Sequence, residues 1–244
     1  MGAQMTFERY ELKYILTGQQ KEEILKAMEP YMALDEYGRT TIRNVYYDTE
    51  NYRLVRKSIE KPVYKEKLRV RSYGRAGAND QVFVELKKKY RDIVYKRRFK
   101  APGRAAADWL DGRGPVPAKN GQIIDEIAYF RDFYKGLAPA CFISYEREAY
   151  YDKKGSGFRV TFDENIMART DRLTLSEDAL GVPLIPRDMT LMEIKCAGGY
   201  PLWLTRVLSR LRIYKTSFSK YGTAYQKLII PVAAAYQTGG RKYA

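Results

Sequence analysis

The sequence predicts a mainly antiparallel β fold of the α+β class, a tunnel-like β-barrel of about eight strands with helices packed outside it. Two observations predict the strands: polar and apolar residues alternate in many segments, and turn residues separate these segments. A third observation predicts that the sheet closes. Cations recur at every second residue, as in Arg69 with Arg71 and Lys87 with Lys89, so each pair lies on one face of its strand.

The first half of the chain is predicted to be mostly strands. Phe7–Leu16 alternates polar with aromatic or aliphatic residues, and Thr17 and Gly18 then introduce a helix over Gln19–Met28. Further strands are expected at residues 42–47, 63–73, 81–90 and 95–101. The turn-rich segment 74–80 suits a hairpin between two of them.

The second half mixes helices and strands. Apolar residues at helical spacing predict helices over residues 105–110, 123–134 and 202–213. Strands are expected at 141–151 and 157–163, which form a hairpin through 153–156, and at 190–195. A basic, aromatic piece, 214–228, follows the last helix. We expect one domain over residues 1–244, with a core of about 7–228 and a frayed end beyond Pro231.

Composition narrows the chemistry to phosphate handling. The net charge of +15 predicts affinity for nucleic acid, anionic membrane surfaces or phosphate-rich small molecules, and charge alone does not choose among them. The absence of histidine excludes Ser-His and Cys-His nucleophilic catalysis and the commonest zinc ligand. Any metal is therefore expected to be Mg²⁺ or Mn²⁺, held by carboxylates and substrate oxygens. Cys141 and Cys196 lack metal-ligand spacing and are expected to be reduced core thiols.

The sequence contains no uncharged apolar run of eighteen residues and no apolar N-terminal segment of the kind found in secretory signals. We therefore expect a cytoplasmic protein with no membrane span. Coupling of its activity to transport would need a membrane partner protein.

Seven strand segments carry a polar face of period two. For any single strand, an antiparallel sheet with one solvated face explains this pattern. The seven strands taken together do not fit a sheet with one solvated face. Solvated faces usually mix both charge signs with Ser, Thr and Gln, whereas these strands concentrate Arg and Lys. Two like charges about 4 Å apart repel by roughly 4 kcal/mol at an effective dielectric constant near 20. An enclosed face of this kind needs acidic neighbours, solvent or a bound polyanion.

Eight short motifs carry a resemblance to a known family. They are Glu8–Tyr14, Leu68–Arg71, Val84–Lys87, Lys96–Phe99, Tyr145–Arg147, Phe158–Val160, Met192–Lys195 and Ser217–Tyr221. Their order resembles that in VTC domains, the catalytic domains of vacuolar transporter chaperone polyphosphate polymerases, within the triphosphate tunnel metalloenzyme (CYTH-like) superfamily. The resemblance runs from about Phe7 to Leu228, nearly the whole chain.

The resemblance implies a tunnel of eight antiparallel strands that binds the phosphates of a nucleoside triphosphate and a growing polyphosphate chain. The implied catalytic residues are Lys13, Arg69, Arg71, Lys87, Arg147, Arg159 and Glu193. The implied further phosphate contacts are Lys96, Arg98, Tyr145, Lys195, Lys215, Ser219 and Lys220. The implied metal ligands are Glu193, Glu11 and Glu85.

Several positions keep a second interpretation. Fungal members of the family carry a basic residue at the place of Ser217, so Lys215 would have to reach into the tunnel instead. Glu85 either binds metal or neutralises Lys87. Asp163 is expected to pair with Arg159 or to cap a turn.

We expect a metal-dependent polyphosphate polymerase that transfers the γ-phosphate of ATP to a polyphosphate chain. The expected partners are ATP or another triphosphate and inorganic polyphosphate, with no nucleic acid. Two alternatives stay open: a tripolyphosphatase or nucleoside triphosphatase on the same fold, and a non-catalytic binder of polyphosphate or RNA. The first alternative shares nearly every binding residue, because it differs only in whether water or a phosphate chain reaches the γ-phosphorus.

Overall fold

One antiparallel sheet forms the body of the molecule. The computed structural model describes residues 10–91, 93–117, 121–196 and 198–232. Eight strands follow one another in the order β1-β10-β8-β7-β3-β4-β5-β6. Their bounds are β1 Tyr10–Thr17, β3 Thr40–Asp48, β4 Tyr64–Tyr73, β5 Gln81–Tyr90, β6 Ile93–Pro102, β7 Ala138–Asp152, β8 Arg159–Arg169 and β10 Met189–Cys196. Two short strands, β2 (Met32–Leu34) and β9 (Val182–Pro183), pair with β7 and β8.

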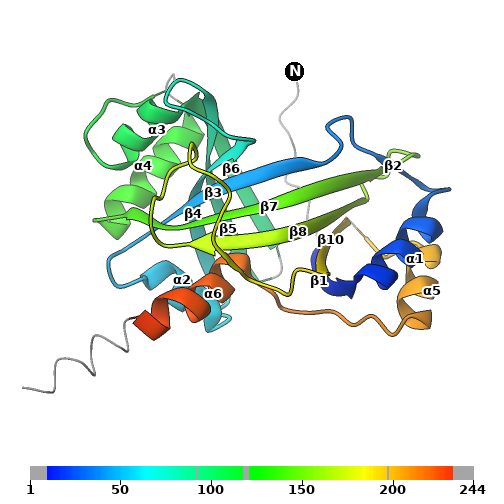
Figure 1. Cartoon of the computed structure of the whole chain (residues 1–244). Coiled ribbons are helices and arrows are strands. Elements are labelled where there is room, and N and C mark those ends of the chain that lie inside the picture. The colour runs from blue at the N-terminus through cyan, green and yellow to red at the C-terminus, as the bar shows by residue number, and fades with distance from the viewer. Residues whose placement is uncertain (1–9, 92, 118–120, 197, 233–244) are drawn as a thin grey trace, which may run out of the picture.

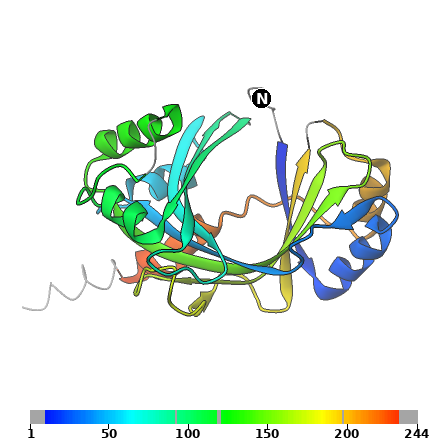
Figure 2. The same ribbon diagram turned by 90° about the horizontal axis from the view of Figure 1, so that it is seen from above.

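The sheet curves into a deep trough rather than a closed barrel. Figure 2 shows β4, β5 and β6 as one arm of the trough and β1 and β10 as the other. Within the described residues, β1 and β6 are the two ends of the strand order and do not pair with each other. The predicted antiparallel class is confirmed, but the predicted closure is wrong. Alternating polarity specifies which face of a strand points inward; it does not specify whether the two edge strands form hydrogen bonds.

Helices cover the outside of both arms (Figure 1). Helix α1 (Gly18–Met28) packs with α5 (Leu202–Arg210) on the arm that contains β1, β8 and β10. Helices α3 (Gly103–Leu110) and α4 (Gln122–Tyr134) pack on the arm that contains β4, β5 and β6. The predicted outer helices are therefore confirmed. No helix of the described chain is both long and apolar enough to cross a membrane.

A third helical group lies at one end of the trough. It consists of α2 (Arg53–Ile59), α6 (Lys220–Ala224) and a π-helical turn, η1 (Tyr225–Ile229), seen together in the lower part of Figure 1. The core residues of this group pack against β3 and β7, with the Tyr221 ring stacked on Tyr46 at a centroid distance of 4.7 Å. This group therefore fills the trough at that end and leaves the charged part of the inner surface beside it.

Most predicted elements are present with small shifts in their bounds. The helix expected over 202–213 ends at Arg210, and the strand expected over 157–163 continues to Arg169. Helix α2 was not predicted; its N-cap, Tyr52, provides no side-chain cap, and the Asp48 carboxylate accepts from the amides of Leu54 and Val55 instead. The predicted start at Phe7 falls on residues 7–9, and the frayed end predicted beyond Pro231 falls, apart from Val232, on residues 233–244; both ranges lie outside the described residues. Both cysteines are free and buried, as predicted.

Candidate functional site

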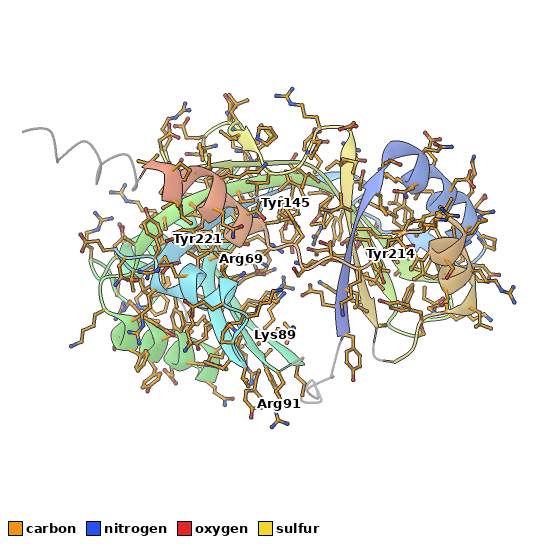
Figure 3. The ribbon with its side chains drawn as sticks, turned by 90° about the horizontal axis from the view of Figure 1, so that it is seen from below. Arg69, Lys89, Arg91, Tyr145, Tyr214 and Tyr221 are labelled. Carbon is orange, nitrogen blue, oxygen red and sulfur yellow. The ribbon has the colours of Figure 1, made fainter. Side chains whose placement is uncertain are left out.

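The concave side of the sheet gathers charged residues from most of its strands. Strand register places Lys13 opposite Glu193 and Arg69 opposite Glu85. Figure 3 shows Arg69 and Lys89 on one arm facing the central space, Tyr145 at the bend and Arg91 at the rim. The inner face, as we define it, consists of Glu11, Lys13, Lys65, Lys67, Arg69, Arg71, Glu85, Lys87, Lys89, Lys96, Arg98, Tyr145, Arg147, Arg159, Thr161, Asp163, Glu193 and Lys195, with Lys220 from α6.

A buried ionic cluster forms where β7, β8 and β10 meet α6. Asp163, with no exposed surface, accepts from Arg147 Nε and Nη2 at 2.5 and 2.7 Å and from Lys220 Nζ at 2.5 Å. Glu193 accepts from Lys220 and Arg147 at 3.1 Å, and Lys13 Nζ lies 3.5 Å away. Burial alone would raise the pKa of Glu193, but the charges of Lys220, Lys13 and Arg147 hold it well below its usual value. Glu193 is thus ionised at neutral pH.

A second cluster surrounds Glu85 on β5. Arg69 donates to Glu85 Oε2 through Nε and Nη2 at 2.9 and 2.7 Å. Lys96 Nζ lies 2.8 Å from the other oxygen, and Arg71 Nε lies 3.8 Å from Oε2. Burial would raise the pKa of Glu85, but Arg69, Arg71 and Lys96 hold it far below its usual value. The single negative charge of Glu85 therefore neutralises only part of the positive charge of Arg69, Arg71 and Lys96.

A third ion pair spans the open side of the trough. Lys87 Nζ on β5 donates to Glu11 Oε2 on β1 at 2.7 Å, and Lys195 Nζ lies 3.7 Å from Glu11 Oε1. Burial lowers the pKa of Lys195 to about 8, although Glu11 and Glu193 partly oppose it. Side chains, rather than a backbone ladder, thus bring the two arms together.

The arginines of the inner face are held in place by neutral groups. Arg69 Nη1 donates to the Tyr46 hydroxyl at 3.0 Å. Arg71 donates to Asn44 Oδ1 at 2.8 Å and to the Tyr145 hydroxyl at 2.9 Å. These contacts fix two guanidinium groups before any ligand binds.

The segment between α5 and α6 crosses one end of the trough, as Figure 3 shows from Tyr214 to Tyr221. Lys13 Nζ donates to the Phe218 carbonyl at 3.1 Å, and the Thr216 amide donates to the Lys13 carbonyl at 2.8 Å. Lys67 Nζ donates to Ser219 Oγ at 2.9 Å. The crossing segment is therefore attached to both arms through inner-face lysines.

The structure brings most predicted site residues together, with two exceptions. Arg159 lies at the rim, with 49% of its side chain exposed, and pairs with Asp35 at 2.9 Å. The predicted pairing of Asp163 with Arg159 is wrong, because Asp163 pairs across strands with Arg147. Lys215 is exposed, and no salt bridge joins it to the described inner-face residues. The assigned roles of all these residues stay predictions.

Tyr46, Asn44 and Lys67 contact the site but were given no role from the sequence. Tyr46 and Asn44 orient arginines, but they are neutral residues in an apolar-looking strand and gave no signal. Lys67 did have a signal in the sequence, since it lies in the alternating row Lys65, Lys67, Arg69. That row alone could have pointed to it.

The donor set of the inner face suits a hard metal ion only in part. Carboxylate oxygens are the donors that Mg²⁺ and Mn²⁺ prefer, and Glu11 and Glu193 lie on the neighbouring strands β1 and β10. Within the described residues, no group of three Asp, Glu, Cys or His side chains could hold a metal. These residues therefore fit an ion that shares its coordination with phosphate oxygens and water, as Mg²⁺ commonly does.

Acid is expected to destabilise the fold through these carboxylates. Glu11, Glu85 and Glu193 have folded-state pKa values below the ordinary glutamate value, so between those values the unfolded chain binds more protons. Their stabilising contribution is present above a pH of about 4.5 and is lost as the pH falls through the folded-state values. Urea unfolding midpoints at pH 7, 5 and 3.5 should fall steeply at the lowest pH. A midpoint that stays constant would contradict the ionic clusters.

Comparisons with known proteins agree with this fold. The family model for the VTC domain matches residues 8–229. A solved structure of a candidate adenylate cyclase from Bacillus halodurans is 13% identical, with a TM-score of 0.56, over 91% of this chain and 97% of that one. A candidate adenylyl cyclase from Hippeastrum, described as having a dominant triphosphatase activity, is 16% identical with a TM-score of 0.48, over 90% and 95% of the two chains. No curated protein sequence matches the chain. The first structure shows a shared fold.

Proposed function

The chain belongs to the VTC domain family, since the family model spans residues 8–229, and we propose that it is a polyphosphate polymerase that transfers the γ-phosphate of ATP to a polyphosphate chain. The observation that carries this proposal is the excess of cations over carboxylates on the inner face. Asp163 and Glu193 are shared by Arg147, Lys220 and Lys13, so each carboxylate is surrounded by more positive than negative charge. A polyanion would supply the missing negative charge.

The residue types of the inner face suit phosphoryl transfer. Arginine binds phosphate oxygens through a planar fork, and lysine acts as a mobile point charge. Arg69 and Arg71 are oriented by Tyr46, Asn44 and Tyr145, so they would meet a phosphate with little reorganisation. Positioning and charge stabilisation of this kind provide most of the catalysis in phosphoryl transfer.

The proposed reaction needs no general base. A terminal oxygen of the polyphosphate acceptor is already anionic; it attacks the γ-phosphorus, and the bond from that phosphorus to the bridging oxygen of ADP breaks. Arg69 on β4 and Arg147 on β7 would bind the donor and acceptor phosphates in line. Glu193 and Glu11 would hold Mg²⁺ or Mn²⁺ against the triphosphate, and the ion would neutralise charge on its oxygens.

The products formed from ATP test this proposal. The purified chain is incubated with ATP and Mn²⁺, and the products are separated on a gel stained for polyphosphate. The polymerase predicts long anionic ladders that are lost on Glu193→Gln substitution. Free phosphate without ladders would contradict the polymerase and indicate a hydrolase on the same fold. Unchanged ATP would contradict both.

Affinity for tripolyphosphate is expected to fall at alkaline pH. Burial lowers the pKa of Lys96 to about 8 and that of Lys195 to about 8. Both ammonium groups lose their charge as the pH rises through these values, so binding should weaken between about pH 7.5 and 9.5. Calorimetric titration at constant ionic strength measures this. The double variant Lys96→Arg/Lys195→Arg should show a flatter profile, because arginine stays charged. An equally steep profile in that variant would show that other groups cause the loss of tripolyphosphate affinity at alkaline pH.

A further inference from the structure

Lys67 is surrounded by other inner-face cations. In the sheet register it lies opposite Lys87, which in turn lies opposite Lys96. Lys65 and Arg69 flank it on the same face of β4, two residues away in each direction. The charge of Lys13, on β1 of the other arm, also acts on Lys67. Cations therefore act on Lys67 from its own strand and from two others, β1 and β5.

No carboxylate of the described chain pairs with Lys67. Each inner-face carboxylate is already bound to other cations: Glu85 on β5 to Arg69 and Lys96, Glu11 on β1 to Lys87 and Lys195, Asp163 on β8 to Arg147 and Lys220, and Glu193 on β10 to Lys220, Arg147 and Lys13. Burial comes first in holding the pKa of Lys67 well below its usual value, followed by the charges of Lys13, Lys87, Lys65 and Arg69. In the free protein the charged form of this amine is therefore less favoured than that of an ordinary lysine.

The one hydrogen-bond partner of the Lys67 amine within the described structure is the hydroxyl of Ser219, at 2.9 Å. Ser219 Oγ also accepts from the Gly222 amide at 3.2 Å, in the first turn of α6. A hydroxyl that accepts two hydrogen bonds keeps its own proton for donation. Lys67 and Ser219 thus place an amine and a hydroxyl donor side by side, where the crossing segment meets β4.

We propose, on the basis of the proposed function, that Lys67 and Ser219 form a phosphate-binding subsite of the inner face and that an oxyanion binding there is accompanied by transfer of a proton from solvent to Lys67 Nζ. The proton adds to the lone pair of the amine, and no bond of the phosphate breaks. An anion beside the amine favours the charged form and removes the like-charge imbalance. Ligand binding and protonation then strengthen each other.

Titration calorimetry on the full chain tests this proposal. Tripolyphosphate is titrated into the protein at pH 7, in the presence of a chelator that removes metal ions. At that pH Lys96 and Lys195, whose pKa values are about 8, are mostly protonated already and add little to proton uptake. Repeating the titration in buffers of different ionisation enthalpy gives the number of protons taken up. The variants are Lys67→Arg, which is charged in both states, and Lys67→Gln. Lys88→Gln is the matched control, because Lys88 lies on the other face of the adjacent strand and pairs with Glu126 at 2.6 Å.

The wild-type chain is expected to take up more protons than Lys67→Arg, by up to about one per ligand, while both bind with affinities within a few fold. Lys67→Gln is expected to bind about tenfold more weakly, and Lys88→Gln as the wild type does. Equal proton uptake by wild type and Lys67→Arg would overturn the proposal, as would unchanged affinity in Lys67→Gln. If the wild-type chain bound no tripolyphosphate, the proposed function itself would fall. Thermal unfolding of each variant confirms that it folds, and the two Lys67 variants give independent readouts.

Discussion

Replacing Asp163 by asparagine is expected to lower the free energy of unfolding by about 3–5 kcal/mol, because it leaves buried cations without their shared counter-charge. Arg147 and Lys220 both reach Asp163 at 2.5 Å, and Asp163 has no exposed surface. Asparagine preserves the volume but removes the charge, so Glu193 alone would face both cations. Guanidinium unfolding at neutral pH, with the midpoint and slope both fitted, measures the change.

Asp178→Asn is the matched control for this prediction. Asp178 pairs with Arg75, but 69% of its side chain is exposed, so solvent screens the pair. Its unfolding midpoint should stay close to that of the wild type. If Asp163→Asn changed stability no more than Asp178→Asn does, the buried cluster would not be stabilising the fold.

Replacing Arg69 by alanine is expected to reduce the rate of polyphosphate synthesis by at least about 100-fold and to weaken tripolyphosphate binding by at least about tenfold. Arg69 is one of two oriented guanidinium groups of the inner face, bound by Glu85 on one side and by Tyr46 on the other. Alanine removes both the fork and a charge that Glu85 partly neutralises. Initial rates with ATP and Mn²⁺, together with calorimetric affinity, separate the two effects.

Arg97→Ala is the control for loss of charge alone. Arg97 lies on β6 next to the inner-face residues Lys96 and Arg98 but points to the opposite side, where it pairs with Glu126 at 3.3 Å. Both variants lower the net charge by one, so a long-range electrostatic effect would weaken binding equally in the two. A loss confined to Arg69→Ala supports an inner-face site, and equal losses would contradict it.

The sequence was most informative where a physical period could be read directly. Alternation at period two placed Arg69, Glu85 and Glu193 on the faces that converge, because side chains of a strand alternate strictly. Helix α1 was predictable as well, and its Thr17 forms a capping box with Gln20.

The parts that escaped prediction depend on contacts between distant segments. Asp163 was assigned to Arg159, but residues four apart in a strand are separated by about 13 Å, so the pairing across strands with Arg147 prevails. Strand β8 was ended too early because Asn165 adopts a φ of 48° at an irregularity that breaks the alternation. Helix α2 depends on Asp48, whose carboxylate reaches its first amides from the end of β3. Neither register nor such tertiary caps can be read from one segment.

A crystal structure of the chain with bound tripolyphosphate tests the central claim most directly. The claim predicts phosphate density on the concave side of the sheet, within hydrogen-bonding distance of Arg69, Arg147 and Lys87, with Arg97 and Lys88 uninvolved. Density restricted to the outer face, with the inner-face cations bound only to their own carboxylates, would contradict it.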